Sequence, residues 1–313
     1  MKIIDTILQS AYFAKRPPVL IDIGASGEIN RKWKRIARYA ICVAFDADDR
    51  EFHIRAEEET NYLKLLVFNR IVTSEPVETA PFFLTSSPFC SSLLEPDIQK
   101  LEPWLFKPLF ALTKVVNLPA VTLGQSLEMA GLTYIDWFKT DTQGTDLRIF
   151  TSLTEELKAD ILAAEFEPGI MDAYKGEDKF DAVIKEMDRQ GFWLSDMQVK
   201  GTQRLRSDYL PSFGRYASER IIKISPCWAE LSFFKAPEKL GNRSLLLLYV
   251  FALLEKQFGF ALELADYGLQ VSQESIFTAA KVAATDIIRK QKRKLPLIIL
   301  HRKINKLFAN LYG

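Results

Sequence analysis

Two short apolar runs, each ended by a glycine or an acid, constrain the fold of this chain more than any other feature. The first is Val19–Ile23, followed by Gly24, and the second covers residues 40–45, followed by Asp46. Runs of this length without polar alternation are typical of strands buried on both faces, as in a parallel sheet. Polar segments that are expected to be helical follow both runs. The order strand, helix, strand, helix predicts an α/β fold with a doubly wound, mostly parallel, Rossmann-like sheet.

The alternation continues less regularly along the chain. Helices are expected at residues 1–17, 28–39, 47–58, 122–130, 145–153 and 180–190, and further strands at residues 63–72, 81–85, 135–141, 161–166, 192–199, 220–224 and 230–234. Residues 86–117 contain serine-rich and aromatic patches, and we expect a long excursion with some helix there. Long excursions are often lids. The aromatic residues of this region either stack on a bound sugar or belong to the core, and they are Phe82, Phe83, Phe89, Trp104 and Phe106.

A composition break at residues 237–241 divides the chain. Beyond it the pattern is helical, with a leucine-rich helix, a second helix near residues 272–290 and a third after Pro296. The longest apolar run, residues 245–254, is about half of the ~20 residues that a membrane-spanning helix needs, so we expect a buried helix. The sequence therefore predicts an α/β domain at residues 1–238 and a helical, basic C-terminal extension at residues 239–313.

Composition excludes several classes of function. The 41 basic and 40 acidic residues leave a net charge of +1, which argues against a nucleic-acid-binding surface over the whole protein. The three cysteines, Cys42, Cys90 and Cys227, form no CxxC pair, so we expect reduced thiols in a cytoplasmic protein. With only His53 and His301 besides, no metal site and no Ser-His-Asp triad is expected. The N-terminus does not have the pattern of a signal peptide.

The turn after the first strand is the sharpest local feature. A strand that stops at Gly24 and Gly27 lets the backbone come close to a ligand, and the following helix offers free N–H groups. Asp46 ends the next strand, where an acid can accept hydrogen bonds from both ribose hydroxyls of an adenosine-containing ligand. No lysine follows the glycines as a P-loop requires. A tight turn without ligand and a solvated acid remain the alternatives.

A polar segment at residues 136–147 is the third feature. Alternation along the expected strand places Lys139 and Asp141 on one side, and Gly144 then allows a turn into a helix. Polar residues at the C-terminal end of a strand lie where open α/β sheets bind ligands. The alternative is a Lys–Asp pair that only stabilises the edge of the sheet.

In this order the segments resemble the FkbM-type family of S-adenosylmethionine-dependent methyltransferases. The similar segments span roughly residues 18–236 and are residues 21–25, 44–48, 91–94, 121–123, 138–144, 164–166, 191–192 and 229–234. The chain departs from the family at three positions. Gly27 stands one position before the usual second glycine, Asp46 stands where glutamate is common, and Asp146 replaces the glutamate that usually follows the glycine of the 138–144 motif.

The resemblance implies a class I methyltransferase fold and methyl transfer from S-adenosylmethionine to a hydroxyl of a saccharide, glycoconjugate or natural product. The cofactor-binding residues that it implies are Asp22, Gly24, Ala25, Gly27, Asp46, Ala47 and Thr140. The alternative is a non-catalytic protein of a glycan-assembly system that binds an adenosine cofactor or acts as a scaffold.

Methyl transfer to a hydroxyl needs alignment and, where the hydroxyl must lose its proton, a base. Both histidines lie outside the motifs, so a carboxylate is the candidate. We expect Asp141 to be this base, with Lys139 orienting it or the acceptor, and Glu165 is the second choice. Asp141 could instead contact only the cofactor or order its loop.

The end of the chain is strongly basic. Residues 281–313 contain nine basic residues and one acid, with leucines and isoleucines among them. Such a helix can lie on an anionic membrane, which would place the protein at the inner membrane surface. The alternatives are a helix docked on the catalytic domain with a solvated basic face and contact with a phosphate-rich or lipid-linked glycan substrate.

Overall fold

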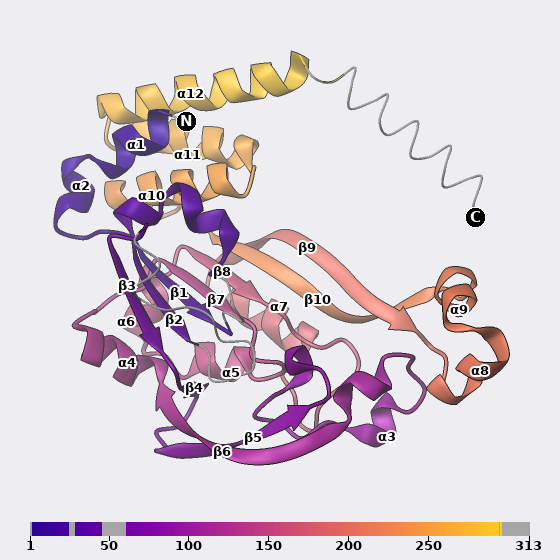
Figure 1. The fold of residues 1–313 in the computed structure, drawn as a ribbon. Helices are drawn as coiled ribbons and strands as arrows, with labels where there is room; N and C mark the ends of the chain where they lie inside the picture. The colour runs from indigo at the N-terminus through magenta and orange to yellow at the C-terminus, as the bar shows by residue number, and fades with distance from the viewer. Residues whose placement is uncertain (1, 25–28, 46–60, 294, 296–313) are drawn as a thin grey trace. The chain divides into compact units, whose positions relative to one another are not determined.

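The computed structural model describes residues 2–24, 29–45, 61–293 and 295 (Figure 1). It divides into two compact units, a sheet unit of residues 16–236 and a helical unit of residues 1–15 and 237–313. The expected domain boundary at residue 238 lies next to this division. Residues 1–15, which we expected in the α/β domain, are grouped instead with the C-terminal helices.

The sheet unit is built on a seven-stranded, mostly parallel sheet, which is compatible with a Rossmann-like fold. Its strand order is β3-β2-β1-β7-β8-β10-β9. The parallel strands are β1 (Val19–Ile23), β2 (Ile41–Phe45), β3 (Lys64–Phe68), β7 (Trp137–Thr140) and β8 (Ala163–Phe166). The long strand β10 (Ile224–Lys235) runs antiparallel to both β8 and β9 (Phe192–Gln203). Because β1 lies between β2 and β7, the direction of strand progression reverses at β1.

Apolar side chains on one face of this sheet form the main core with α4 (Leu123–Ala130), α5 (Asp146–Thr151) and α7 (Phe180–Arg189). Phe138 and Phe150 meet edge to face, with ring centroids 5.6 Å apart. Thr122 begins α4 with a capping box, accepting from Gln125 N while Gln125 Oε1 accepts from Thr122 N. The helix α6 (Glu155–Asp160) precedes β8. On the other face, Trp33 packs edge to face against Trp137.

A separate three-stranded sheet has the order β4-β6-β5 and consists of β4 (Ile71–Thr73), β5 (Thr79–Thr85) and β6 (Leu112–Thr122). The expectation of one strand at residues 63–72 was wrong, because β3 and β4 pair in different sheets. The excursion between β5 and β6 contains the short helices η3 (Pro88–Cys90), α3 (Ile98–Leu101) and η4 (Lys107–Phe110). Its last residues, expected to be irregular, belong to β6.

Three further expectations need correction or lie outside the described residues. Residues 31–39 form two short 3-10 helices, η1 (Arg31–Arg35) and η2 (Ala37–Tyr39), instead of one α-helix. The strand expected at residues 220–224 was wrong, because α9 (Arg215–Ile221) occupies its first part. With η5 (Ser207–Tyr209) and α8 (Leu210–Phe213), α9 forms the tip of the β9–β10 hairpin (Figure 1). The helix expected at residues 47–58 lies outside the described residues.

The helical unit contains α1 (Lys2–Leu8), α2 (Ala11–Ala14), α10 (Asn242–Leu254), α11 (Phe258–Val271) and α12 (Ser275–Arg293). The leucine-rich helix is α10, whose residues 245–253 are all buried. The helix α11 was not predicted, and the helix expected after Pro296 lies outside the described residues. In the part of the chain that the structure describes, no helix has both the length and the apolar character to span a bilayer.

Candidate functional site

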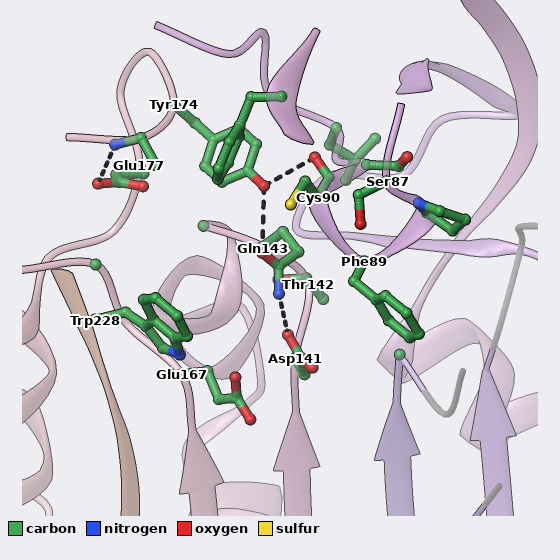
Figure 2. A pocket seen from close by; sticks show the side chains of 18 of the residues that line it. Ser87, Phe89, Cys90, Asp141, Thr142, Gln143, Glu167, Tyr174, Glu177 and Trp228 are labelled. Carbon is green, nitrogen blue, oxygen red and sulfur yellow. Dashed lines mark hydrogen bonds between the residues drawn. The ribbon is translucent and has the colours of Figure 1, made fainter. Parts of the chain in front are cut away.

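A cavity of about 470 Å³ lies beyond the carboxyl ends of the central parallel strands (Figure 2). The strand ends that line it contribute Ile23 at the end of β1 and Gly24 after it, Phe45 at the end of β2, Asp141 after β7 and Glu167 after β8. Strand progression reverses between β2, β1 and β7, and open α/β sheets bind ligands in the crevice outside such a switch point. Cavities of 300–1,000 Å³ are typical of small-molecule sites.

The remaining walls of the cavity are mainly apolar. They come from residues 70–72 at β4, from β5, the excursion, residues 142–144, residues 169–177 and β10. The apolar lining residues include Phe82, Pro88, Phe89, Leu93, Phe106, Leu109, Phe110, Met171 and Trp228, and the basic one is Arg70. Phe106 stacks on Trp228 with centroids 6.3 Å apart and 8° between the planes. Of the aromatic residues expected in a lid, Phe82, Phe89 and Phe106 line the cavity, whereas Phe83 and Trp104 do not.

Gly24 is a position that only glycine fits. Its φ is +78°, and a Cβ there would lie 2.1 Å from the carbonyl oxygen of Asp141. The backbone is drawn together because Gly24 N donates to Phe45 O at 3.0 Å and Asp141 N donates to Ile23 O at 3.0 Å. The sequence predicted a close approach to a ligand at this glycine. Among the described atoms, the close approach of Gly24 is to the loop after β7, and the approach to a ligand stays a prediction.

Asp22, Lys139 and Glu165 form a charged row across three neighbouring strands. Lys139 Nζ lies 2.8 Å from Asp22 Oδ1, and Asp22 Oδ2 accepts a hydrogen bond from Asn30 N at 2.9 Å. Burial alone lowers the pKa of Lys139, but the carboxylates of Asp22, Asp141 and Glu165 outweigh it and hold this pKa above its ordinary value. None of the three side chains lines the cavity.

Glu165 is held by structural contacts. Its Oε1 accepts hydrogen bonds from Trp137 Nε1 at 2.9 Å and Asn30 Nδ2 at 3.3 Å, and Lys32 Nζ lies 3.1 Å from Oε2. Both carboxylate oxygens are therefore engaged away from the cavity. The structure does not bring Glu165, our second choice for the base, to the cavity.

Asp141 is the predicted catalytic residue that does line the cavity. Gln143 Nε2 donates to Asp141 Oδ1 at 2.6 Å, and Gln143 has a φ of +57°. The Tyr174 hydroxyl lies 3.2 Å from Gln143 Oε1 and 2.9 Å from the Cys90 carbonyl oxygen (Figure 2). Burial raises the pKa of Asp141 to about 6; the charge of Lys139 opposes the rise and that of Asp146 adds to it. A fixed carboxylate with this pKa is suited to act as a base near neutral pH.

Asp146 orders the loop that carries Asp141. Its Oδ1 accepts from Thr140 Oγ1 at 3.0 Å and Thr142 N at 2.8 Å, and its Oδ2 accepts from Glu167 N at 3.1 Å. Thr140, which the resemblance assigned to the cofactor, is buried and does not line the cavity. The hydroxyl of Thr140 instead binds Asp146.

Glu167 is one of three cavity-lining acids that the sequence analysis missed, together with Glu177 and Glu230. Figure 2 shows it beside Asp141 and below Trp228. Among the described residues, none donates a hydrogen bond to its carboxyl group. Burial first, and then the charges of Asp141 and Glu230, raises the pKa of Glu167 to about 9. Glu167 is thus protonated near pH 7 while Asp141 is ionised, an arrangement that can separate acid and base roles.

Four of the residues assigned to the cofactor, Ala25, Gly27, Asp46 and Ala47, lie outside the described residues. Among the residues that the structure does describe, no group of three or more acidic, histidine or cysteine side chains is arranged to hold a metal ion. Gly24 and Asp141 are the predicted site residues that the structure brings together around the cavity.

Comparison with known proteins adds little to this geometry. No family model matches the chain, and no curated protein matches it. Among solved structures, the crystal structure of the [4+2]-cyclase SpnF is similar with a TM-score of 0.30 and 10% sequence identity. The match covers 75% of this chain and 80% of SpnF. A likeness this weak carries no argument, so the FkbM-type resemblance stays a prediction.

Proposed function

We propose that this chain is an S-adenosylmethionine-dependent O-methyltransferase that acts on a hydroxyl of a saccharide, glycoconjugate or natural product. The observation that carries the proposal is the cavity at the switch point of the parallel sheet, with Gly24 and Asp141 side by side at its edge. The motif resemblance supplies the identity of the cofactor, and the position of the cavity supports it.

The residues present fit this cofactor. The cavity has the size of a small-molecule site. Acids outnumber bases in its lining even when Glu167, which is neutral near pH 7, is left out, and this excess suits a ligand that carries a positive charge. The other lining acids are Asp141, Glu177 and Glu230, and the lining base among the described residues is Arg70. The indole of Trp228 lines the same cavity, and aromatic faces attract cations. Gly24 and Trp228 are the described residues that would hold the cofactor.

S-adenosylmethionine supplies an electrophilic methyl group when bound. The chain has to position the acceptor hydroxyl, exclude water and take up a proton. The apolar walls exclude water, protonated Glu167 can donate a hydrogen bond to the acceptor, and the Asp141 carboxylate accepts the hydroxyl proton. Gln143 fixes the direction of that carboxylate, and the buried charge of Lys139 keeps it ionised near neutral pH. A base positioned in this way contributes about 10²–10⁴-fold to a rate.

The first test is isothermal calorimetry with S-adenosylmethionine. The wild-type chain should bind it, and Gly24→Ala should bind at least about tenfold more weakly, because the added Cβ forces the β1 end away from Asp141. Gly131→Ala is the matched control, since Gly131 also has a positive φ but nothing lies within 4 Å of its Cβ position. No binding by the wild-type chain at millimolar cofactor rejects the proposal.

The second test measures transfer of a labelled methyl group into a saccharide-containing extract. Asp141→Asn should reduce transfer by about 10²-fold or more while changing cofactor affinity much less, because it removes the base. Equal transfer by Asp141→Asn and wild type contradicts the role of Asp141. Cofactor binding without transfer to any acceptor fraction favours the non-catalytic alternative.

A further inference from the structure

The tip of the β9–β10 hairpin, residues 204–224, exposes large apolar side chains to solvent. The exposed fractions are 46% for Tyr209, 57% for Phe213, 71% for Tyr216, 78% for Ile221 and 56% for Ile224. Scattered exposed apolar residues are common, but five within one short segment are not. This cluster, called the hairpin tip below, therefore indicates an interaction surface.

The hairpin tip is held in place by its own polar contacts. Gln203 Nε2 donates to Glu219 O at 2.9 Å, and Ser218 Oγ donates to Gly214 O at 2.9 Å. Gln203 is 5% exposed and Ser218 is fully buried. These two buried polar side chains satisfy backbone carbonyls inside the tip, while its large apolar side chains are exposed to solvent.

Basic side chains surround the exposed apolar ones. Residues 204–224 include five basic and two acidic residues. Asp208 forms an ion pair with Arg206. The Arg220 guanidinium lies 3.6 Å from the centroid of the Tyr216 ring, and Lys223 is exposed beside Ile224. Tyrosine and arginine at the edge of an aliphatic patch are suited to the boundary between lipid and water.

We propose that the hairpin tip binds an anionic membrane surface, inserting Phe213 and Ile221 among the lipids. Anionic lipids complement the positive charge, with each nearby lysine or arginine contributing about 1 kcal/mol. A second copy of the chain is a poorer partner, because a two-fold contact would bring two basic rims together. Nucleic acid is also a poorer partner, because Ile221, the most exposed residue of the set, offers no stacking face.

The position of the hairpin tip gives this contact a role. Trp228, which lines the cavity, follows Ile224 by four positions on β10, a distance of about 13 Å along a strand. Leu105 N, in the excursion that forms another wall, donates to Gln203 O at 3.1 Å. A membrane held by the tip therefore lies close to the cavity. Membrane binding by the hairpin tip follows from its exposure and charge and does not depend on the proposed methyl transfer.

Co-sedimentation of the full-length chain with vesicles tests the proposal. Vesicles of phosphatidylcholine with phosphatidylglycerol should pellet the wild-type chain at low salt, and vesicles of phosphatidylcholine alone should pellet much less. The double variant Phe213→Ser/Ile221→Ser should bind at least about tenfold more weakly, and so should Arg220→Glu/Lys223→Glu, which reverses the charge at two positions but keeps the apolar patch. Leu63→Ser/Met129→Ser is the matched control, because these residues are 57% and 68% exposed elsewhere in the sheet unit.

The basic C-terminus provides the competing explanation. A Lys290→Glu/Lys292→Glu variant should keep most of its vesicle binding if the hairpin tip is the contact. Loss of binding in this variant, with binding retained in both tip variants, overturns the proposal. The proposal is also overturned if the wild-type chain does not bind anionic vesicles. It is overturned as well if the wild-type chain is a dimer and the tip variants are monomers, because the hairpin tip would then be a contact between copies of the chain.

Discussion

Two glutamates only two positions apart have opposite surroundings. Glu165 lies within β8 and accepts hydrogen bonds from Trp137 and Asn30, with Lys32 beside it. Glu167 lies just beyond the end of the strand, lines the cavity and is shifted toward its neutral form by burial and by other acids. Because the residue type is the same, the difference comes from position: the glutamate within the strand makes structural contacts, and the one beyond its end lines the cavity.

This difference predicts a pH-dependent effect of Glu167→Gln on stability. Folded Glu167 keeps its proton up to about pH 9, whereas a glutamate in the unfolded chain loses it near 4.5. The folded state therefore binds more protons between these values, and the stability of the wild-type chain falls as the pH rises through them. Because glutamine does not ionise, Glu167→Gln should be more stable than wild type by over about 1 kcal/mol at pH 8 and about equal at pH 4.5.

Urea denaturation at these two pH values measures the effect. Glu165→Gln is the control, since it weakens the contact with Lys32 and should not stabilise the chain. A gap between Glu167→Gln and wild type that stays the same at both pH values would show that Glu167 does not carry a raised pKa.

At the scale of elements, the loop between β7 and α5 is held by the hydrogen bonds of one buried side chain and not by regular backbone pairing. Asp146, 1% exposed, binds the Thr140 hydroxyl, the Thr142 amide and the Glu167 amide. It thereby connects the ends of the neighbouring strands β7 and β8, beside Asp141 and at Glu167. The family that the sequence resembles usually has glutamate at this position, and here the shorter aspartate accepts hydrogen bonds from the ends of both strands.

Asp146→Ala should therefore destabilise the chain strongly. The substitution leaves four donors without this acceptor, namely the Thr140 hydroxyl, the Thr142 amide and hydroxyl, and the Glu167 amide. The first of these hydrogen bonds is buried and the others are partly buried, and each unsatisfied buried group costs about 1–3 kcal/mol, so a loss of at least about 3 kcal/mol is expected. Chemical denaturation monitored by circular dichroism gives this value. Asp181→Ala is the control, because Asp181 forms an exposed (i, i+4) pair with Lys185 and should change stability by less than about 0.5 kcal/mol. Similar losses in both variants would contradict the role of Asp146.

The elements that could be predicted from the sequence are those whose signal is local. β1 and β2 are continuous apolar runs, and α4 and α7 begin or end at a capping threonine or a glycine in the left-handed region. The break between β3 and β4 could not be predicted, because it depends on which distant strands each half pairs with. The helix α11 was missed because its glycines disfavour a helix locally. The packing of α11 against α12 requires glycine at position 268, because a Cβ there would lie 2.2 Å from the Phe277 ring.

The candidate site divides in the same way. Gly24 was predicted because a strand that ends in glycine signals a close backbone approach, and Asp141 because acids at the ends of parallel strands gather at one edge. Alternation also selected Lys139, but the sheet buries it against Asp22. Glu167 was missed because it lies just beyond the predicted strand at residues 161–166, whose acid is Glu165. The aromatic wall at Trp228 depends on the β9–β10 pairing, which no local pattern specifies.

At the scale of the whole molecule, both ends of the chain belong to one unit. Residues 1–15 and 237–313 group together, with the sheet unit inserted between them in sequence. Glu274, just before α12, connects the two segments of the helical unit. Its Oε1 accepts hydrogen bonds from the Tyr12 hydroxyl and from Asn242 Nδ2, the latter at 2.6 Å. One carboxylate thus holds α2 to the beginnings of α10 and α12.

Glu274→Ala should therefore loosen the N-terminal helices without disturbing the sheet. Losing hydrogen bonds to a charged group, each contributing about 1.5–3 kcal/mol, should speed amide hydrogen exchange across α1 and α2 by at least about tenfold. Exchange in β7 and β8 should not change, because these strands belong to the other unit. Glu263→Ala, at an exposed position of α11, is the control and should leave exchange at the wild-type rate. Faster exchange in β7 and β8 as well would mean that the two units unfold together, and unchanged exchange in α1 and α2 would mean that apolar packing alone holds the N-terminal segment.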